Sequence, residues 1–347
     1  MKSEISIVIP NFNRNKLFVK TLDSIRSQSI NNWRCIIVDD GSEEETLNAL
    51  KKYIQNDSRF ELFSRDRKPK GANTCRNIGL SQVKTDWVMF FDSDDLMMPR
   101  CLEKRNNAIE KNKNKDFLLF QGATFSNGQI TGLRNNAQSK DYIKEIIRFN
   151  CALSTPSAVW KTSSLREITG WDERIFRWQD PELFIRALQN NLKFKWISEV
   201  PDHLIRVDTE IRITDSITKF NDLDVLIKIF CKIHESIENQ YKSDFSHSIH
   251  WYCLKASYYI SQNQKNITLN HIQKHNILRG FKLYKFLCLM HANNRFKNIK
   301  FIKGIIHLFI VREFNNFKNY PIYKDEKIIE LFKEKYKSDY FKLIRDK

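Results

Sequence analysis

The sequence lacks any hydrophobic run long enough to cross a bilayer. Its most apolar late stretch, GIIHLFIV at 304–311, is far shorter than the roughly 20 residues that a spanning helix needs. The opening residues, MKSEISIVIP, carry no apolar segment of the signal-peptide kind. We therefore expect a protein that is made and kept in the cytoplasm.

Paired cysteines, internal repeats and long low-complexity linkers are missing as well. The seven cysteines are an odd number and include no C-x-x-C pair, which is typical of reduced thiols rather than of a disulfide framework. The composition, with 41% hydrophobic and 29% charged residues, is that of a soluble globular protein. A length of 347 residues allows one large domain, or one domain with an extension.

Positive charge is in excess and is unevenly distributed. The formal net charge is +17, and from Lys219 onward 24 basic residues face 12 acidic ones. The first 218 positions therefore carry only +5. We predict a domain over 1–218, in two halves, 1–100 and 101–218. A basic, mainly helical region follows at 219–347.

The first 125 residues alternate short apolar runs with longer amphipathic ones. This βαβ rhythm predicts an α/β fold with a mostly parallel sheet flanked by helices. One helix is expected to start at the capping box Ser42-x-x-Glu45, and another at Pro99. The expected strands are 5–9, 34–38, 60–64, 87–91 and 116–125.

Polar clusters follow three of these strands. They are PNFNR (10–14), DDGS (39–42) and DSDD (92–95). Because ligands of such sheets gather at the carboxyl ends of the strands, we expect the three clusters to share one site.

The DSDD cluster places three carboxylates within four positions. It could be a solvated loop of helix-capping aspartates. However, a buried strand delivers it to the ligand edge, and hard oxygen ligands suit Mg²⁺ or Mn²⁺. Carboxylates this close repel one another unless a cation lies among them. An ion held here could complete its coordination with substrate phosphates.

Two neighbouring segments also have both a structural and a functional interpretation. DDGS could be only a turn, or its aspartates could accept hydrogen bonds from a base or a ribose hydroxyl. KGANTCRNIGL (70–80) could present a solvated basic helix face. Alternatively, Arg76 could counter the acidic cluster and contact phosphate or base.

Four motifs, IVIPNFNR, IIVDDGS, KGANTCRNIGL and FFDSDDLMMP, occur in the order and at about the spacing found in family 2 glycosyltransferases. The sequence thus resembles that family over its first 100 residues, which implies a GT-A fold and a nucleoside-diphosphate-sugar donor. It makes 1–100 the nucleotide-sugar half of the 1–218 domain and 101–218 its acceptor half. The resemblance implies a metal, Mn²⁺ or Mg²⁺, on the carboxylates of Asp92, Asp94 and Asp95. Which of the three binds the metal directly and which holds the ribose stays open, and we favour Asp94 and Asp95 for the metal. The resemblance also implies a nucleotide-sugar pocket formed by Pro10, Asn11, Phe12, Arg14, Asp39, Asp40, Gly71, Arg76, Asp92, Ser93 and Asp94.

The segment GWDERIFRWQDPELFIRAL (170–188) resembles the acceptor side of the same family. On that match Asp180 is the candidate general base, although Asp180-Pro181 could also be a helix N-cap pair. Gln179 stands where the family commonly has an acid, which leaves Glu182 as the substitute base. Trp178 and Glu182 are candidate acceptor contacts. Trp171 and Trp178 are either core residues or a sugar-stacking platform.

Residues 255–318 carry 12 basic residues and one acid among large apolar side chains. Three interpretations stay open: a solvated helical face, a nucleic-acid site without a recognition motif, and a helix pair on an anionic membrane surface. We favour the last and expect no nucleic acid. It would keep the protein at the inner face of the cytoplasmic membrane, near a lipid-linked glycan acceptor.

The resemblance predicts an inverting transfer of a sugar, most simply from a UDP-sugar, in cell-surface polysaccharide biosynthesis. A nucleotidyltransferase that makes sugar nucleotides is one alternative. However, no Gly-rich loop with a following lysine occurs near the N-terminus. The other alternative is a non-catalytic UDP-binding protein, against which the intact acidic cluster argues.

Overall fold

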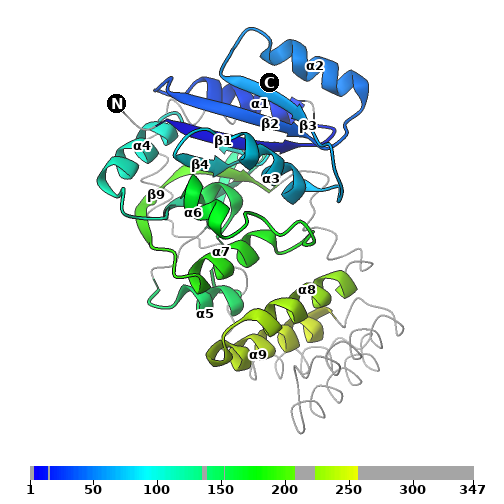
Figure 1. The fold of residues 1–347 in the computed structure, drawn as a ribbon, viewed down its shortest axis with the longest axis vertical. Helices are drawn as coiled ribbons and strands as arrows, with labels where there is room; N and C mark the ends of the chain where they lie inside the picture. The colour runs from blue at the N-terminus through cyan, green and yellow to red at the C-terminus, as the bar shows by residue number, and fades with distance from the viewer. Residues whose placement is uncertain (1–3, 15, 135–138, 152, 208–222, 257–347) are drawn as a thin grey trace. The chain divides into compact units, whose positions relative to one another are not determined.

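The computed structural model describes residues 4–14, 16–134, 139–151, 153–207 and 223–256 (Figure 1). These residues form two compact units, each described here by itself. The sheet unit contains the described residues of 4–134 and 153–207. The helical unit contains 139–151 and 223–256.

The sheet unit is built around one large sheet, interrupted by helices along the chain. Its strands are β1 (Ile5–Asn11), β2 (Trp33–Asp39), β3 (Phe60–Ser64), β4 (Trp87–Phe90), β5 (Leu96–Met97), β6 (Phe117–Ser126), β7 (Gln129–Arg134), β8 (Ala158–Lys161) and β9 (Phe194–Arg206). Its helices are α1 (Lys16–Arg26), α2 (Glu44–Ile54), α3 (Ala72–Gln82), α4 (Cys101–Lys111), the 3₁₀ turn η1 (Thr155–Ser157), α6 (Thr162–Glu167) and α7 (Gln179–Gln189).

The strand order is β3-β2-β1-β4-β8-β6-β9-β5, with β7 paired to β6. The first four strands are parallel, as the βαβ rhythm requires. β8 runs antiparallel to both β4 and β6, and β9 returns parallel to β6. The predicted α/β fold class is therefore confirmed, but the sheet is mixed.

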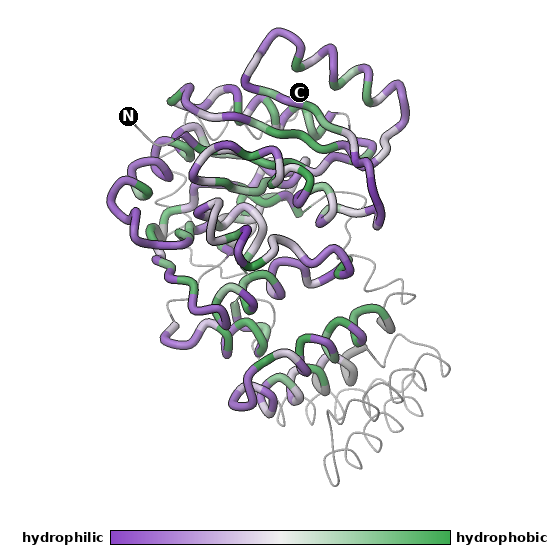
Figure 2. The backbone as a smooth tube through the Cα atoms, viewed as in Figure 1, coloured by the Kyte–Doolittle hydropathy of each residue, from purple (hydrophilic) through white to green (hydrophobic). Residues whose placement is uncertain are grey.

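Helices cover both faces of this sheet. On one face α1, α2 and α4 pack over alternate residues of β1 and β2, including Ile7 and Ile37. On the other face α3 lies close to the sheet, because Gly79 presents no side chain to Val8 and Val38. Hydrophobic residues accordingly run along the central strands (Figure 2). This packing fixes the strand ends that carry the polar clusters.

The five expected strands are all present, with ends shifted by two residues or fewer. Both predicted helix starts are shifted: α4 begins at Cys101 rather than at Pro99, and α2 begins at Glu44 with Glu43 as its N-cap. The Ser42 capping box is therefore wrong. The hydroxyl of Ser42 is used elsewhere, as described below.

The helical unit consists of α5 (Tyr142–Ile147), α8 (Leu223–Ser236) and α9 (Asn239–Ala256). Its interior contains aromatic side chains, with Phe149 and Phe230 at 5.8 Å and Phe230 and Phe245 at 5.8 Å between ring centroids. An ion pair of 2.7 Å between Arg148 and Asp244 lies beside them. Segment 139–151 groups with these helices, although it precedes the predicted boundary at 218.

In the ranges that the structure describes, no helix is long and apolar enough to cross a membrane. The basic segment 255–318 lies outside those ranges except for its first two residues, so the membrane-surface interpretation stays a prediction.

Candidate active site

The ends of β1 and β2 are joined through the carboxylate of Asp39. Its Oδ1 accepts hydrogen bonds from the side chains of Asn11 (3.0 Å) and Ser42, and its Oδ2 accepts from the backbone N–H groups of Gly41 (3.0 Å) and Ser42 (2.8 Å). These four donors fill the acceptor sites of a carboxylate. Asp39 is buried as well, so the structure favours a turn-forming role over the predicted contact with a base.

Ser42 and Asn13 connect the PNFNR and DDGS clusters through hydrogen bonds. The backbone N–H of Asn13 donates to the Ser42 hydroxyl at 2.8 Å, and the Asn13 side chain accepts from the N–H of Glu43 at 2.9 Å. Asn13 thus supplies the capping acceptor of α2 from a different loop. Sequence analysis missed this residue, because its partner lies 30 positions away.

Asp40 connects the same edge to the segment before α3. Its carboxylate forms an ion pair with Arg65 and accepts a hydrogen bond from the N–H of Gly71 at 3.3 Å. Gly71 has φ +146°, a conformation that favours glycine. Next to it, the Lys70 ammonium lies 3.6 Å from the ring centroid of Phe12, which is 43% exposed.

The DSDD loop follows β4 and is pinned by three arginines. Asp92 pairs with Arg76 at 2.7 Å, and Asp94 lies 3.4 Å from Arg14. Asp95 accepts the backbone N–H of Arg206 at 3.0 Å. The carboxylates therefore have defined and different surroundings.

Asp95 is the most buried member of this cluster, with 3% of its surface exposed. Burial raises its pKa well above the usual value, and the negative charges of Asp94 and Asp92 raise it further. A cation placed among the three carboxylates would relieve this repulsion.

Arg76 is the central connection of the site. Its Nη1 donates to Asn73 (2.9 Å) and Gln179 (2.8 Å), and its Nη2 donates to Asp92 (2.7 Å) and Thr155 (3.4 Å). The guanidinium also lies 4.4 Å from the ring centroid of Trp171. The predicted partnership of Arg76 with the acidic cluster is thus present, although the side chain is buried and engaged by protein acceptors.

Asp180 faces this arginine from the first turn of α7. The N-cap of that helix is Trp178, which has φ +56°, so the interpretation of Asp180 as an N-cap is wrong. Thr155 Oγ1 donates to Asp180 Oδ1 at 2.6 Å. Desolvation raises the pKa of Asp180 to about 6, although Arg76 and the Thr155 hydrogen bond lower it. A carboxyl group with this pKa is mainly ionised at neutral pH and can still accept a proton.

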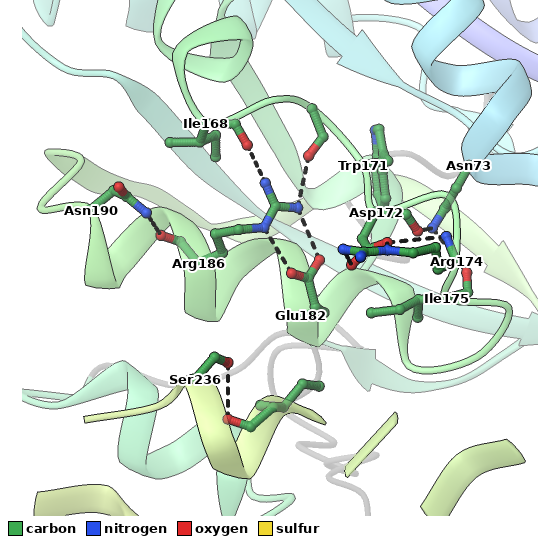
Figure 3. A network of polar contacts seen from close by, with 12 residues as sticks. Asn73, Ile168, Trp171, Asp172, Arg174, Ile175, Glu182, Arg186, Asn190 and Ser236 are labelled. Carbon is green, nitrogen blue, oxygen red and sulfur yellow. Dashed lines mark hydrogen bonds and ion pairs between the residues drawn. The ribbon is translucent and has the colours of Figure 1, made fainter. Parts of the chain in front are cut away.

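Glu182 belongs to a network that holds the start of this segment (Figure 3). Both of its carboxylate oxygens accept from Arg186, at 2.7 and 2.9 Å, and Arg186 also donates to the carbonyl oxygens of Ile168 and Gly170. This pairing favours a structural role for Glu182.

The two tryptophans of the segment differ. Trp171 is 3% exposed and packs edge-on against Phe90, at 5.3 Å between centroids, so it belongs to the core. Trp178 is partly exposed in a left-handed conformation that costs a non-glycine residue roughly 1 kcal/mol. Such strain is typical of functional positions.

Comparison with known protein sequences identifies the family of this chain. The family description "Glycosyl transferase family 2" matches residues 6–167. An uncharacterized glycosyltransferase of Methanocaldococcus jannaschii is 30% identical over 205 residues, which are 57% of this chain and 69% of that protein. The chain belongs to glycosyltransferase family 2.

Solved structures give this family 2 glycosyltransferase a GT-A-like fold. S. aureus TarS 1–349, in complex with UDP-GlcNAc, has a TM-score of 0.63 at 16% identity, covering 92% of this chain and 93% of that one. The mannosyltransferase PcManGT of Pyrobaculum calidifontis, in complex with GDP-Man and Mn²⁺, has a TM-score of 0.52 at 12% identity, covering 90% and 88%. At these identities the likeness concerns the fold alone.

The residues of this glycosyltransferase fit a divalent ion that is shared with substrate. No group of three or more His, Cys, Asp or Glu in the described parts of the chain is arranged to hold a metal by itself. Mg²⁺ and Mn²⁺ bound with nucleotides commonly take one or two carboxylates and complete their coordination with phosphate and water. Asp94 and Asp95, with their mutual repulsion, match that kind of site.

Proposed function

We propose that this chain is an inverting glycosyltransferase that uses a nucleoside-diphosphate sugar, most simply a UDP-sugar. The acceptor is a hydroxyl of a glycan or of a lipid-linked glycan in cell-surface polysaccharide biosynthesis. One observation carries the proposal. A carboxylate suited to be a base, Asp180, faces the acidic donor-side cluster across Arg76, which hydrogen-bonds both Asp92 and the Thr155 partner of Asp180.

In the proposed reaction Asp180 accepts the proton of the acceptor hydroxyl as that oxygen attacks the anomeric carbon. The new glycosidic C–O bond forms while the bond from the anomeric carbon to the diphosphate oxygen breaks, and the nucleoside diphosphate leaves. A single displacement of this kind inverts the configuration. It requires no enzyme-bound sugar.

The donor-side assignments follow from which groups face the shared edge. Phe12 offers a partly exposed ring for stacking, with the Lys70 ammonium near it, and Asp40 accepts the N–H of Gly71, the residue after Lys70. Arg14 lies beside Asp94 and would contact the diphosphate. Pro10 and Asn11 end β1, and Asn11 binds Asp39, which holds the turn after β2. Asp92 and Ser93 belong to the loop after β4. Asp94 and Asp95 would hold Mn²⁺ or Mg²⁺, which when bound supplies a positive charge that stabilises the departing diphosphate.

On the acceptor side we assign Trp178, because it is the N-cap residue directly before the helix turn that carries Asp180. Glu182 would support that turn through Arg186. We retain the basic segment 255–318 as the part that meets an anionic membrane surface, and we assign the protein to the inner face of that membrane.

The pH dependence of turnover tests the base. Because the pKa of Asp180 is raised to about 6 and only its ionised form can accept a proton, kcat/KM is expected to fall about tenfold per pH unit below about pH 6. Initial rates between pH 5 and 8 would measure this, with unfolding temperatures recorded at each pH. An activity that stays level down to pH 5 would contradict the assignment.

A panel of nucleotide sugars, screened with and without Mn²⁺ for a rise in unfolding temperature, tests the donor class. A true donor stabilises the folded state, and we expect the largest rise for a UDP-sugar with Mn²⁺. Transfer assays with the same panel then separate the alternatives. Pyrophosphate release from a nucleoside triphosphate would indicate a nucleotidyltransferase. Binding of UDP without hydrolysis or transfer from any donor would indicate a non-catalytic protein.

A further inference from the structure

The hydroxyl of Thr155 lies between the two charged groups of the site. Its oxygen accepts a hydrogen bond from Arg76 Nη2 at 3.4 Å, and its proton is donated to Asp180 Oδ1 at 2.6 Å. A guanidinium can only donate, so the hydroxyl has to point its single hydrogen at the carboxylate. The direction of this hydrogen bond is therefore fixed by chemistry.

The turn that carries Thr155 is held from several sides. Within it, the backbone N–H of Ser154 donates to the Ser157 hydroxyl at 3.0 Å, and Pro156 restricts the backbone. The carbonyl oxygen of Pro156 accepts from Arg105 Nη2 at 2.8 Å. Arg105 is fully buried and is itself paired with Asp202 through two contacts of 2.9 Å. Thr155 is consequently a fixed point against which Asp180 is oriented.

This arrangement makes the two oxygens of the carboxylate unequal. Oδ1 accepts the Thr155 hydroxyl, whereas none of the described residues donates a hydrogen bond to Oδ2. We infer that Thr155 is a positioning residue that orients the Asp180 carboxylate and directs the acceptor proton to Oδ2. The inference rests on the proposed function, because it specifies how the base of that reaction is held.

The proton then has one path. The acceptor O–H bond breaks, its proton moves to Asp180 Oδ2, and the acceptor oxygen bonds to the anomeric carbon as the diphosphate leaves. Thr155 keeps its own proton throughout. Without its hydroxyl, the carboxylate could rotate toward Arg76, and fewer molecules would present Oδ2 to the acceptor.

Thr155→Val tests the role of this hydroxyl, because valine has nearly the same shape and lacks the O–H. We expect kcat to fall by about 10- to 100-fold, with little change in KM for the donor. Thr155→Ser, which restores the hydroxyl, should recover most of the rate. The matched control is Thr162→Val. Thr162 is as buried as Thr155, and its hydroxyl donates to the backbone of Thr85 at 2.8 Å, away from the site.

The acid limb of the kcat profile provides a second readout. The charged groups that act on Asp180 are Arg76 on α3, Asp92 after β4 and Arg134 at the end of β7, and none of them changes in Thr155→Val. Loss of the Thr155 hydrogen bond should move this limb to higher pH. A purely structural loss, as in Thr162→Val, should leave it in place.

The possible outcomes separate the inference from the function on which it rests. If Thr155→Val turns over like wild type while Asp180→Asn is inactive, the inference is overturned and the proposed base stands. If Asp180→Asn is active, both are overturned. If Thr155→Val does not fold, Thr155→Ala, which introduces no new atom, carries the same expectation and the same refutation.

Discussion

Asp180→Asn is expected to lower kcat by about 10²- to 10⁴-fold, the range that general-base catalysis contributes. The amide keeps the shape of the side chain and can still accept the Thr155 hydrogen bond, but it cannot take a proton at neutral pH. Donor binding should persist, because the donor-side groups come from other segments. Transfer rates and donor-induced thermal stabilisation, measured on the same preparation, would show the two effects separately.

Asp172→Asn is the control for this variant. It removes an equal charge from the same segment, where Asp172 pairs with the exposed Arg174 at 2.9 Å. Only the Arg174 end of this pair is exposed, but asparagine keeps the shape of Asp172 and an oxygen for the backbone N–H of Arg174, so turnover of this variant should remain near wild type. Near-wild-type turnover of Asp180→Asn would require a different base.

Asp95→Asn is expected to raise the unfolding temperature in EDTA and to lower Mn²⁺-dependent turnover by at least about 100-fold. Asp95 is buried against the charges of Asp94 and Asp92, so its carboxylate is unfavourable unless a cation is bound. Asparagine removes that repulsion and retains an oxygen for the N–H of Arg206. A gain in stability together with a loss of activity is typical of a residue kept for function.

Asp57→Asn should show the opposite sign of stability change. Hydrogen bonds from Arg59 hold the pKa of Asp57 at about 2, below its unfolded value, so its charge stabilises the folded state above the unfolded pKa. That contribution is lost as the pH falls toward 2. We therefore expect Asp57→Asn to lower the unfolding temperature at neutral pH and to leave turnover unchanged. A lowered unfolding temperature for Asp95→Asn would contradict the repulsion argument.

The parallel half of the fold was predictable because three of its four strands, β1, β2 and β4, are mainly apolar runs that are buried along almost their whole length. β8 and β9 were not predicted, and their sequences explain why. β8 has only four residues, of which three are apolar. β9 carries Asp202 and His203 at buried positions, where their mutual contact of 2.7 Å and the pairing of Asp202 with Arg105 satisfy them. Only tertiary structure reveals such compensation.

The candidate site, too, was predictable only in part. The motif positions at the strand ends do meet, because parallel strands bring their carboxyl ends to one edge. The roles of individual side chains depend on distant partners instead. Ser42 looked like a helix cap but binds Asp39, and no sequence motif marked Thr155, which contacts Asp180, 25 positions away.

The hydrogen bond between Asp95 and Arg206 joins residues that are far apart in the sequence, and this separation matters for synthesis of the chain. Arg206 ends β9, and its backbone N–H reaches Asp95 across 111 positions. At typical translation rates the ribosome needs on the order of ten seconds to cover that interval. A nascent chain therefore presents the edge of β6 that β9 later pairs with before its partner exists, and such an edge can recruit other strands. Co-translational maturation of the acidic loop would wait for the last strand of the sheet.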